Sequence, residues 1–410
     1  MNARVEPPEE KKKKKKRKTK DSSPPPPSSS SASFSLLPDE IAENYLARIS
    51  RSYYPTLSIV STTFRSILSS TELYEARAHL ESTEQCLYVC LSDRSYQFPQ
   101  WFTLWINPNR TLPNKRRKKK KRQLLVPITS SNFNSQSVSV AVGSEIYVIG
   151  GPVDRAPSSA VRVLDCRSHT WRDAPSMIVA RNYASACVYD EKIYVMGGCE
   201  RLEDESWGEV FDTKTQTWEL LPDPGTEVRK GYAHTRRISE CKGKIQLENG
   251  MNVYAYDTKS GKWEYCDDIK SEMFPGSTCV IDDVSYRYWR YVFLWFDIEK
   301  GVWKEVKGLE LLGVKHQRNG GATYNTTKLV SCGGKLLLIW EGFLRYCSNY
   351  KKKIWCAEIV LEKRGGGEVW GMAEWVDVVH TVPSSCSNKK HRVMCSSSSS
   401  ACTYTWVHFG

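Results

Sequence analysis

The sequence predicts a multidomain protein: a small all-α domain of three helices, followed by an all-β propeller of about five to six blades, some degenerate. Apolar residues recur at helical spacing within residues 34–80. Short β-like runs begin at about residue 86, and two markers then repeat at intervals of roughly 45 residues. A chain of 410 residues that is 40% hydrophobic is long enough to bury both cores.

The N-terminal segment, residues 1–33, is predicted to be a disordered tail. Its lysine run at 11–20 repels itself, and the Pro- and Ser-rich stretch that follows has little apolar area to bury. The run is either a nuclear-import signal or a solvated tail. A second basic run within residues 113–123 is expected to form a loop inserted in the propeller. The expected localisation is nuclear, cytoplasmic or both.

The net charge of +13 comes from these two runs, which supply nine and eight positive charges. The rest of the chain is therefore close to neutral, and a basic groove across the main domain is not expected. The runs also lack interleaved aromatic side chains on which bases could stack. Nucleic acid is thus an improbable partner, although binding through the runs stays open as a third hypothesis with a steep salt dependence.

The cysteines and apolar runs indicate neither a metal site nor a membrane span. The 14 cysteines include no CxxC pair, and no zinc spacing of Cys and His occurs. No secretory signal opens the chain, and no apolar run approaches the length of a membrane span. We expect free thiols in a reducing compartment, with no cofactor, metal or membrane partner.

The helical region has recognisable starts and faces. Pro38 lies near a helix start, and the acidic Asp39 and Glu40 suit the positive end of a helix. A second start follows at Pro55, and a third short helix covers Thr71–Leu80. Since each helix is too short to be stable alone, the three must pack together. The apolar positions that recur every three or four residues are Ile41, Tyr45, Leu46 and Ile49, then Leu57, Val60, Phe64 and Ile67 or Leu68.

Two markers define the repeats of the β region. Segments 138–151 and 184–198 each read as a hairpin that ends in paired glycines, Gly150–Gly151 and Gly197–Gly198. These glycines are expected where the backbone of a neighbour comes too close for a side chain. The second marker is an Asp six residues before a Trp, at the end of a strand and before a polar turn. It occurs as Asp165/Trp171, Asp212/Trp218, Asp257/Trp263 and Asp297/Trp303.

Both regions resemble known families. The segment SLLPDEIAENYLARISRSYYPTLSIVSTTFRSIL resembles an F-box, the three-helix module that docks on the Skp adaptor of SCF (Skp–cullin–F-box) ubiquitin ligases. The glycine pairs and spaced tryptophans resemble kelch repeats, and the combination is similar to plant F-box/kelch-repeat proteins. The resemblance implies positions that contact the adaptor or pack the F-box, with Leu37 and Pro38 as the leading contact pair. The matching residues are Leu37, Pro38, Ile41, Leu46, Ile49, Leu57, Val60, Phe64 and Leu68.

Later repeats depart from the kelch pattern. Segment 244–257 has no double glycine, and none precedes Trp303. In the last recognisable unit, Gly333–Gly334 falls at a hairpin turn, Trp340–Gly342 takes the blade position, and Trp375 is the expected marker. The propeller is predicted over 86–380, with a Ser-rich segment over 381–410 that fits the pattern poorly. A sixth blade could be built from residues 86–106 and the far C-terminus.

The sequence predicts no enzyme, because no catalytic motif occurs and RGGGEVWG reads as a hairpin rather than a phosphate loop. The resemblance implies a substrate-recognition subunit of an SCF ligase, joined through the Skp adaptor to a cullin and holding an unknown target protein. The alternative is a kelch interaction scaffold that works without SCF. Loops after the glycine pairs would recognise the target. Arg181 and Arg229, each just before a first strand, are the candidates to line the mouth of the propeller.

Overall fold

The computed structural model describes parts of both predicted domains. The described residues are 38–82, 84, 86–91, 99–104, 125–128, 137–153, 156–199, 206–229, 237–241, 243–249, 252–266, 277–321, 326–342, 352–382 and 406–408. The expected tail at 1–33, the basic loop at 113–123 and the contact candidate Leu37 lie outside these residues.

The helical domain contains α1 (Asp39–Ala47), η2 (Arg51–Tyr53), α2 (Tyr54–Leu57), α3 (Thr62–Leu68) and α4 (Thr71–His79). The prediction of one continuous second helix is wrong. The Ser61 side chain accepts a hydrogen bond from the Phe64 N–H at 3.0 Å and so caps a new helix, which separates α2 from α3. Ser70 caps α4 in the same way through the Leu73 N–H. The short helices pack around a shared apolar core that includes Leu46 and Leu73.

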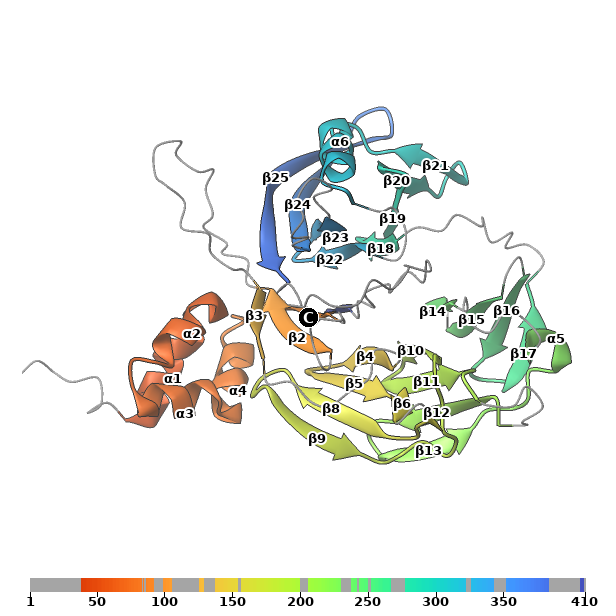
Figure 1. The fold of residues 1–410 in the computed structure, drawn as a ribbon, viewed down its shortest axis with the longest axis horizontal. Helices are drawn as coiled ribbons and strands as arrows, with labels where there is room; N and C mark the ends of the chain where they lie inside the picture. The colour runs from red at the N-terminus through yellow and green to blue at the C-terminus, as the bar shows by residue number, and fades with distance from the viewer. Residues whose placement is uncertain are drawn as a thin grey trace, which may run out of the picture.

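The described β residues form six four-stranded antiparallel sheets arranged as a propeller, which confirms the predicted fold class (Figure 1). We number the blades along the chain. Blade 1 holds β1 (Leu87–Leu91), β2 (Gln100–Leu104), β3 (Leu125–Pro127) and β26 (Trp406–His408). Blade 2 holds β4 (Val138–Val142), β5 (Glu145–Ile149), β8 (Val161–Asp165) and β9 (Thr170–Ala174), with a small hairpin of β6 (Pro152–Val153) and β7 (Ala156–Pro157).

The next four blades each use consecutive strands. Blade 3 holds β10 (Ser185–Tyr189), β11 (Lys192–Met196), β12 (Gly208–Asp212) and β13 (Thr217–Leu220). Blade 4 holds β14 (Arg237–Cys241), β15 (Lys244–Asn249), β16 (Asn252–Asp257) and β17 (Lys262–Tyr265). Blade 5 holds β18 (Ser277–Ile281), β19 (Val284–Trp289), β20 (Val292–Asp297) and β21 (Val302–Glu305). Blade 6 holds β22 (Thr327–Cys332), β23 (Lys335–Gly342), β24 (Lys353–Arg364) and β25 (Glu368–Thr381).

Blade 1 combines the first three strands of the β region with β26, which follows blade 6 in the sequence. β26 pairs antiparallel with β1, with Tyr88 opposite Val407. It also contacts β4 of blade 2 and β22 of blade 6, so it takes the inner position that a first strand takes in the other blades (Figure 1). The sixth blade that the sequence left open therefore exists, built from residues near 86–104 and the far C-terminus.

The aspartate of each Asp–Trp marker shapes the turn that follows it. Oδ1 of Asp212 accepts hydrogen bonds from the N–H groups of Lys214 (2.9 Å) and Thr215 (3.2 Å). These backbone donors lower the pKa of the Asp212 carboxyl, because they favour its charged form. The residue four positions after each aspartate has a positive φ, namely His169, Gln216, Gly261 and Gly301. The marker thus specifies one hairpin geometry in blades 2 to 5.

The marker tryptophans pack against the preceding strand, and three of them also contact the neighbouring blade. Nε1 of Trp218 donates to the carbonyl oxygen of Pro175 at 2.8 Å, and Nε1 of Trp263 donates to Pro222 at 3.0 Å. Trp171 lies edge-on to the buried Trp101 of blade 1, with ring centroids 6.0 Å apart. Trp303 stacks under the Arg287 guanidinium, 4.1 Å from the ring centroid. The predicted space-filling role between sheets is confirmed for Trp171, Trp218 and Trp263, whereas the described contacts of Trp303 lie within blade 5.

Trp375 does not occupy the marker position of blade 6, so that prediction is wrong. By register, Ile359 corresponds to Phe211 of blade 3, and its partner on β25 is Ala373, whereas Phe211 faces Trp218. A bulge beside Ile359 shifts Trp375 opposite Glu358, to whose carboxylate its Nε1 donates. The long β24–β25 hairpin turns at residues 365–367, as RGGGEVWG predicts, and lacks the aspartate turn.

The glycine pairs lie where neighbouring backbones come very close. A Cβ on Gly150 would lie 2.8 Å from the Arg181 carbonyl oxygen, and one on Gly198 would lie 2.5 Å from that of Asn182. A Cβ on Gly151 would meet the Ser137 backbone at 2.9 Å. Gly197 has a φ of +71°. The predicted reason for the glycines, the close approach of backbone, is confirmed for Gly150, Gly151 and Gly198.

Two connecting helices were not predicted: α5 (Thr226–Arg229) before blade 4 and α6 (Glu310–Arg318) before blade 6. The inner face of α6 buries Leu312 and His316 against blades 5 and 6. None of the helices in the described part of the chain combines the length and the apolar character needed to cross a bilayer.

Candidate functional site

The first helix presents an exposed apolar face. Ile41 is 43% exposed and Tyr45 is 60% exposed, and Pro38 is also exposed. Their spacing of three and four residues places them on the same side of α1. Exposed apolar side chains that cluster in this way mark a surface for a partner. We call Pro38, Ile41 and Tyr45 the α1 face.

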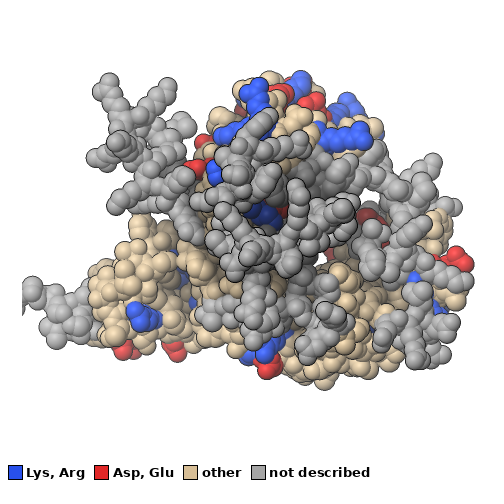
Figure 2. All heavy atoms as spheres, in the orientation of Figure 1, with Lys and Arg blue, Asp and Glu red and all other residues tan. Residues whose placement is uncertain are grey.

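Acidic side chains border the α1 face. Asp39, Glu40 and Glu43 all belong to this helix. The pKa of the Glu43 carboxyl is raised, first by partial burial and then by the nearby carboxylates of Glu72 and Asp39. Elsewhere the visible side of the helical domain carries few charged side chains (Figure 2). The geometry suits a partner with an apolar centre and a basic border.

A second exposed apolar element is the turn between α2 and α3. Ile59 is 75% exposed and Val60 is 65% exposed. The Val60 N–H donates to the Leu57 carbonyl at 3.0 Å, which holds the turn after α2. Val60 was a predicted contact residue, but it lies in this turn and not in a helix. Sequence reasoning missed Ile59 as a contact candidate. The signal that could have found it is that Ile59 and Val60 form an apolar pair directly before Ser61, a residue type that often caps a helix.

The other predicted contact residues pack the helical domain. Leu46 and Leu68 are only 1% and 7% exposed, so their side chains stabilise the domain and cannot reach an adaptor. Ile49, Leu57 and Phe64 are half-buried against the same core. Tyr45 belongs to the predicted helical pattern but not to the predicted contacts; its 60% exposure on the α1 face makes it a further candidate.

Arg181 is not a surface residue, and the prediction that it lines the propeller mouth is wrong. Its side chain is fully buried and paired with the equally buried Glu209, with Nε 2.8 Å from Oε1. Its guanidinium also donates to the carbonyl oxygens of Gly197, Trp207 and Ser206, each at 2.8 Å.

The backbone of Arg181 is bonded to blade 2 while its side chain is bonded to blade 3. Its carbonyl accepts from the Gly151 N–H at 3.0 Å, and its own N–H donates to Ser158 at 3.0 Å. Arg181 is therefore a staple between two blades. Arg229, the other candidate, ends α5 and forms an ion pair with Asp223 at 2.6 Å, with 12% of its side chain exposed. Its role as a substrate contact stays a prediction.

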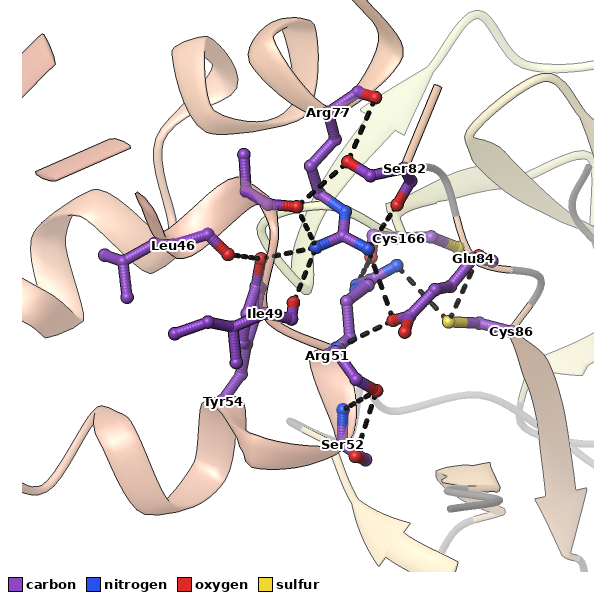
Figure 3. Close-up of polar contacts among 12 residues, drawn as sticks. Leu46, Ile49, Arg51, Ser52, Tyr54, Arg77, Ser82, Glu84, Cys86 and Cys166 are labelled. Atoms are coloured by element: carbon purple, nitrogen blue, oxygen red, sulfur yellow. Dashed lines mark hydrogen bonds and ion pairs between the residues drawn. The ribbon is translucent and has the colours of Figure 1, made fainter. Parts of the chain in front are cut away.

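A buried polar cluster joins the helical domain to the propeller (Figure 3). Arg77 of α4 is 3% exposed, and its Nη1 donates to the carbonyls of Ala47 (2.9 Å) and Ile49 (2.8 Å). Its Nη2 lies 3.3 Å from Oε2 of Glu84, in the segment that leads to β1. The same carboxylate oxygen accepts from the Arg51 N–H at 2.7 Å. Arg77 and Glu84 thus clamp the end of the helical domain to its own 3₁₀ turn.

The Arg51 side chain crosses from the helical domain into the propeller. It is 8% exposed, and its Nη2 donates to the Cys166 carbonyl in blade 2 at 2.9 Å. Its Nη1 contacts the Cys86 sulfur at 3.4 Å, and its guanidinium lies 5.0 Å from the centroid of the Tyr74 ring. Burial raises the pKa of the Cys86 thiol, which keeps it protonated and unreactive.

The described residues show no arrangement that would hold a metal, since none of them form a group of three His, Cys, Asp or Glu side chains within reach of one ion. His316 is fully buried between Tyr288 and Thr327, and burial lowers its pKa to about 4. It is therefore a neutral hydrogen-bonding residue of the core at physiological pH.

Comparison with known proteins gives consistent results for both domains. Residues 34–76 match the F-box domain family, and residues 101–380 match the family described as FKB95, Kelch-repeats domain. The F-box/kelch-repeat protein At4g19870 of Arabidopsis thaliana is 60% identical over 367 residues, which cover 86% of this chain and 90% of the relative. F-box/kelch-repeat protein At4g19865 of the same plant is 61% identical over 363 residues, with the same coverage.

A third relative, F-box/kelch-repeat protein At4g39550 of Arabidopsis thaliana, is 43% identical over 366 residues, covering 85% of this chain and 90% of its own length. Proteins with this pair of domains fit the family of SCF substrate receptors, which act as adaptors. The helical domain, the six-bladed propeller and these matches together establish that the chain belongs to the plant-type F-box/kelch-repeat proteins.

Proposed function

We propose that this protein is the substrate-recognition subunit of an SCF ubiquitin ligase. Its F-box docks on a Skp-type adaptor, which binds the cullin, while the propeller holds the target protein. The observation that carries the proposal is the α1 face, an apolar surface with an acidic border on a domain whose own core is already filled by Leu46 and Leu68. Such a surface has no packing role within the described chain and fits a partner.

Catalysis in this proposal belongs to other subunits. The protein increases the rate by holding a target lysine at high effective concentration near the charged ubiquitin. The family match supports an adaptor role rather than a chemical one. Target identity would be decided by the propeller loops, because loops on a rigid scaffold carry recognition.

The adaptor interface can be tested by substitution on the α1 face. We expect Ile41→Asp to weaken binding to a purified Skp adaptor by about 30-fold or more, because burying an unpaired carboxylate at an interface centre costs at least about 2 kcal/mol. Binding would be measured by calorimetry with the co-expressed or mixed proteins. Leu311→Asp is the matched control: Leu311 is 83% exposed on α6 of the propeller, so it receives the same charge far from the F-box in sequence.

The controls separate loss of fold from loss of contact. Both variants should keep the wild-type melting temperature within a few degrees, since neither position is buried. Adaptor binding that survives Ile41→Asp unchanged would contradict the α1 face as the interface. A wild-type protein that does not bind the adaptor at all would favour the scaffold alternative, as would partners whose half-lives do not change when this protein is depleted.

A further inference from the structure

The F-box rests on one hairpin turn of the propeller, between β8 and β9 of blade 2. The Cys166 carbonyl in this turn accepts from Arg51 Nη2 at 2.9 Å and from the Tyr88 hydroxyl of blade 1 at 2.8 Å. The Tyr88 oxygen also lies 2.9 Å from Nε2 of His169 in the same turn. Because the hydroxyl proton is directed to Cys166, the His169 Nε2–H is the donor in this second bond. We call Cys86, Tyr88, Cys166 and His169 the Arg51 seat.

The β8–β9 turn, which contributes Cys166 and His169 to the seat, differs from the equivalent turns of blades 3 to 5 at these two positions. The residue after the marker aspartate is Cys166 here, but Thr213, Thr258 and Ile298 in blades 3 to 5. Cys166 is 3% exposed, whereas Ile298 is 81% exposed. His169 replaces Gln216, Gly261 and Gly301, and it keeps the positive φ that the turn requires, at 58°. Cys166 and His169 therefore suit a turn that the F-box covers, although the backbone geometry of this turn is the same as that of the exposed turns.

The side of the junction that belongs to the F-box is equally constrained. The Arg51 N–H donates to Glu84, which pairs with Arg77, and Arg77 in turn binds the carbonyls at the end of α1. The Ser82 hydroxyl donates to the Ala47 carbonyl at 2.9 Å. These buried bonds leave little freedom for the F-box to rotate about the segment between α4 and β1.

We propose that Arg51 is a positioning residue: by binding its seat, it fixes the direction of the F-box relative to the propeller and so selects which lysines come within reach of the charged ubiquitin. This inference rests on the proposed SCF function. In a reaction driven by proximity, a hinged junction would spread the bound target over many orientations, while a fixed one presents the same few lysines each time. Arg51 touches neither ubiquitin nor the target and acts only through geometry.

The first measurement needs no partner. Spin labels introduced through unnatural amino acids at the exposed Glu75 of α4 and Glu219 of β13 report the distance between the two domains without using the native cysteines. We expect a narrow distance distribution for the wild type and a broad one for Arg51→Ala. Arg51→Lys should restore only part of the narrowing, because an ammonium group cannot reach the Cys86 sulfur and the Cys166 carbonyl with the fork geometry of a guanidinium.

The second measurement uses the chain as its own acceptor of ubiquitin. In a reconstituted ligase with the full-length protein, mass spectrometry maps which propeller lysines are modified, such as Lys214, whose side chain is 73% exposed. We expect the wild type to be modified at a restricted set. In Arg51→Ala, modification of that set should fall about ten- to a hundred-fold and spread to other lysines, while adaptor affinity stays unchanged.

Two further variants distinguish the loss of the Arg51 contact from a folding defect in Arg51→Ala. Tyr88→Phe removes one hydroxyl from the seat and leaves the F-box untouched, and it should broaden the distance distribution in the same direction. Arg162→Ala, on β8 with 38% side-chain exposure, should change neither readout. Unchanged distances and an unchanged lysine pattern in Arg51→Ala and Tyr88→Phe would overturn the proposal. A wild type that binds no adaptor would instead overturn the proposed function and the lysine selection with it, while the distances still decide whether Arg51 fixes the junction.

Discussion

Replacement of Arg181 by methionine tests whether blades 2 and 3 are held together by a buried ion pair. Methionine keeps most of the side-chain volume but removes the charge and all the donors. The Glu209 side chain has no exposed area. Of its described hydrogen bonds, its carboxylate would keep the one from the Ile178 N–H to Oε2, at 2.8 Å. The Gly197 and Ser206 carbonyls would each lose a donor at 2.8 Å, whereas Trp207 would still accept from the Gly197 N–H.

The expected loss follows from these contacts. Removing one partner of a buried ion pair typically costs about 3–5 kcal/mol, because the other charge is left without compensation. At roughly 2–4 °C per kcal/mol for a domain of this size class, the melting temperature should fall by about 6–20 °C. In Arg181→Met combined with Glu209→Leu the buried charge is gone, so we expect the double variant to lie only about 1–2 kcal/mol below wild type.

The assay is urea unfolding followed by tryptophan fluorescence, supported by thermal scans of the same variants. Arg162→Met is the control, since Arg162 pairs with Asp173 at 2.8 Å on the exposed surface of blade 2 and should contribute less than about 1 kcal/mol. If Arg181→Met lost no more stability than Arg162→Met, the site would have to be open to water. The structural role given to Arg181 would then be refuted.

Three further results are expected. Gly198→Ala should lower the stability of the propeller far more than Gly333→Ala. Both glycines have a positive φ, which costs alanine about 1–2 kcal/mol, but only at Gly198 would the new Cβ also meet a backbone oxygen. Equal melting temperatures for the two variants would contradict this. Stability should fall as the pH drops from about 6.5 towards 4, because His316 has its pKa lowered to about 4 and the unfolded chain takes up the proton first. The share of His316 in this loss is about 2 kcal/mol at pH 5. His316→Gln should therefore reduce the slope in pH-dependent urea unfolding, leaving the part due to His169, whose pKa is also lowered to about 4; His79→Gln on the exposed side of α4 should leave the slope unchanged. A chain that ends at residue 382 lacks β26 and leaves the inner edge of β1 unpaired, so light scattering should detect self-association that the full chain does not show.

The periodic parts of the fold could be predicted from the sequence because each repeat carries its own local chemistry. The aspartate before a polar turn specifies a hairpin wherever it occurs, and Asp212 and Asp257 make the same two backbone contacts. The start of α1 at Pro38–Asp39 is equally local. The break between α2 and α3 depends on the Ser61 cap, and the apolar pattern continues across it, so periodicity alone does not reveal it.

Features that depend on distant residues could not be read in this way. Arg181 lies just before a strand, and that position does not tell a buried residue from an exposed one. Its partner Glu209 lies 28 positions further along the chain, in a strand whose sequence does not mark it as buried. Arg51 bonds to the carbonyl of Cys166, 115 positions away, in a turn that begins with the same marker aspartate as the exposed turns of the other blades. Trp375 looked like a marker because a bulge cannot be seen in composition or spacing. Burial and register, and not residue type, decide these roles.

The position of β26 in the sequence determines when blade 1 can be completed during synthesis. The F-box and the outer strands of blade 1 leave the ribosome before blades 2 to 6, yet β26, the strand that completes blade 1, is made only after all of them. At about 5–20 residues per second, β3 waits roughly 15–55 s for β26. During that interval the edge of β1 that β26 will cover is unpaired, and an unpaired edge can pair with a strand of another chain unless neighbouring blades or chaperones shield it. We therefore expect the yield of closed propeller to depend on the rate of synthesis.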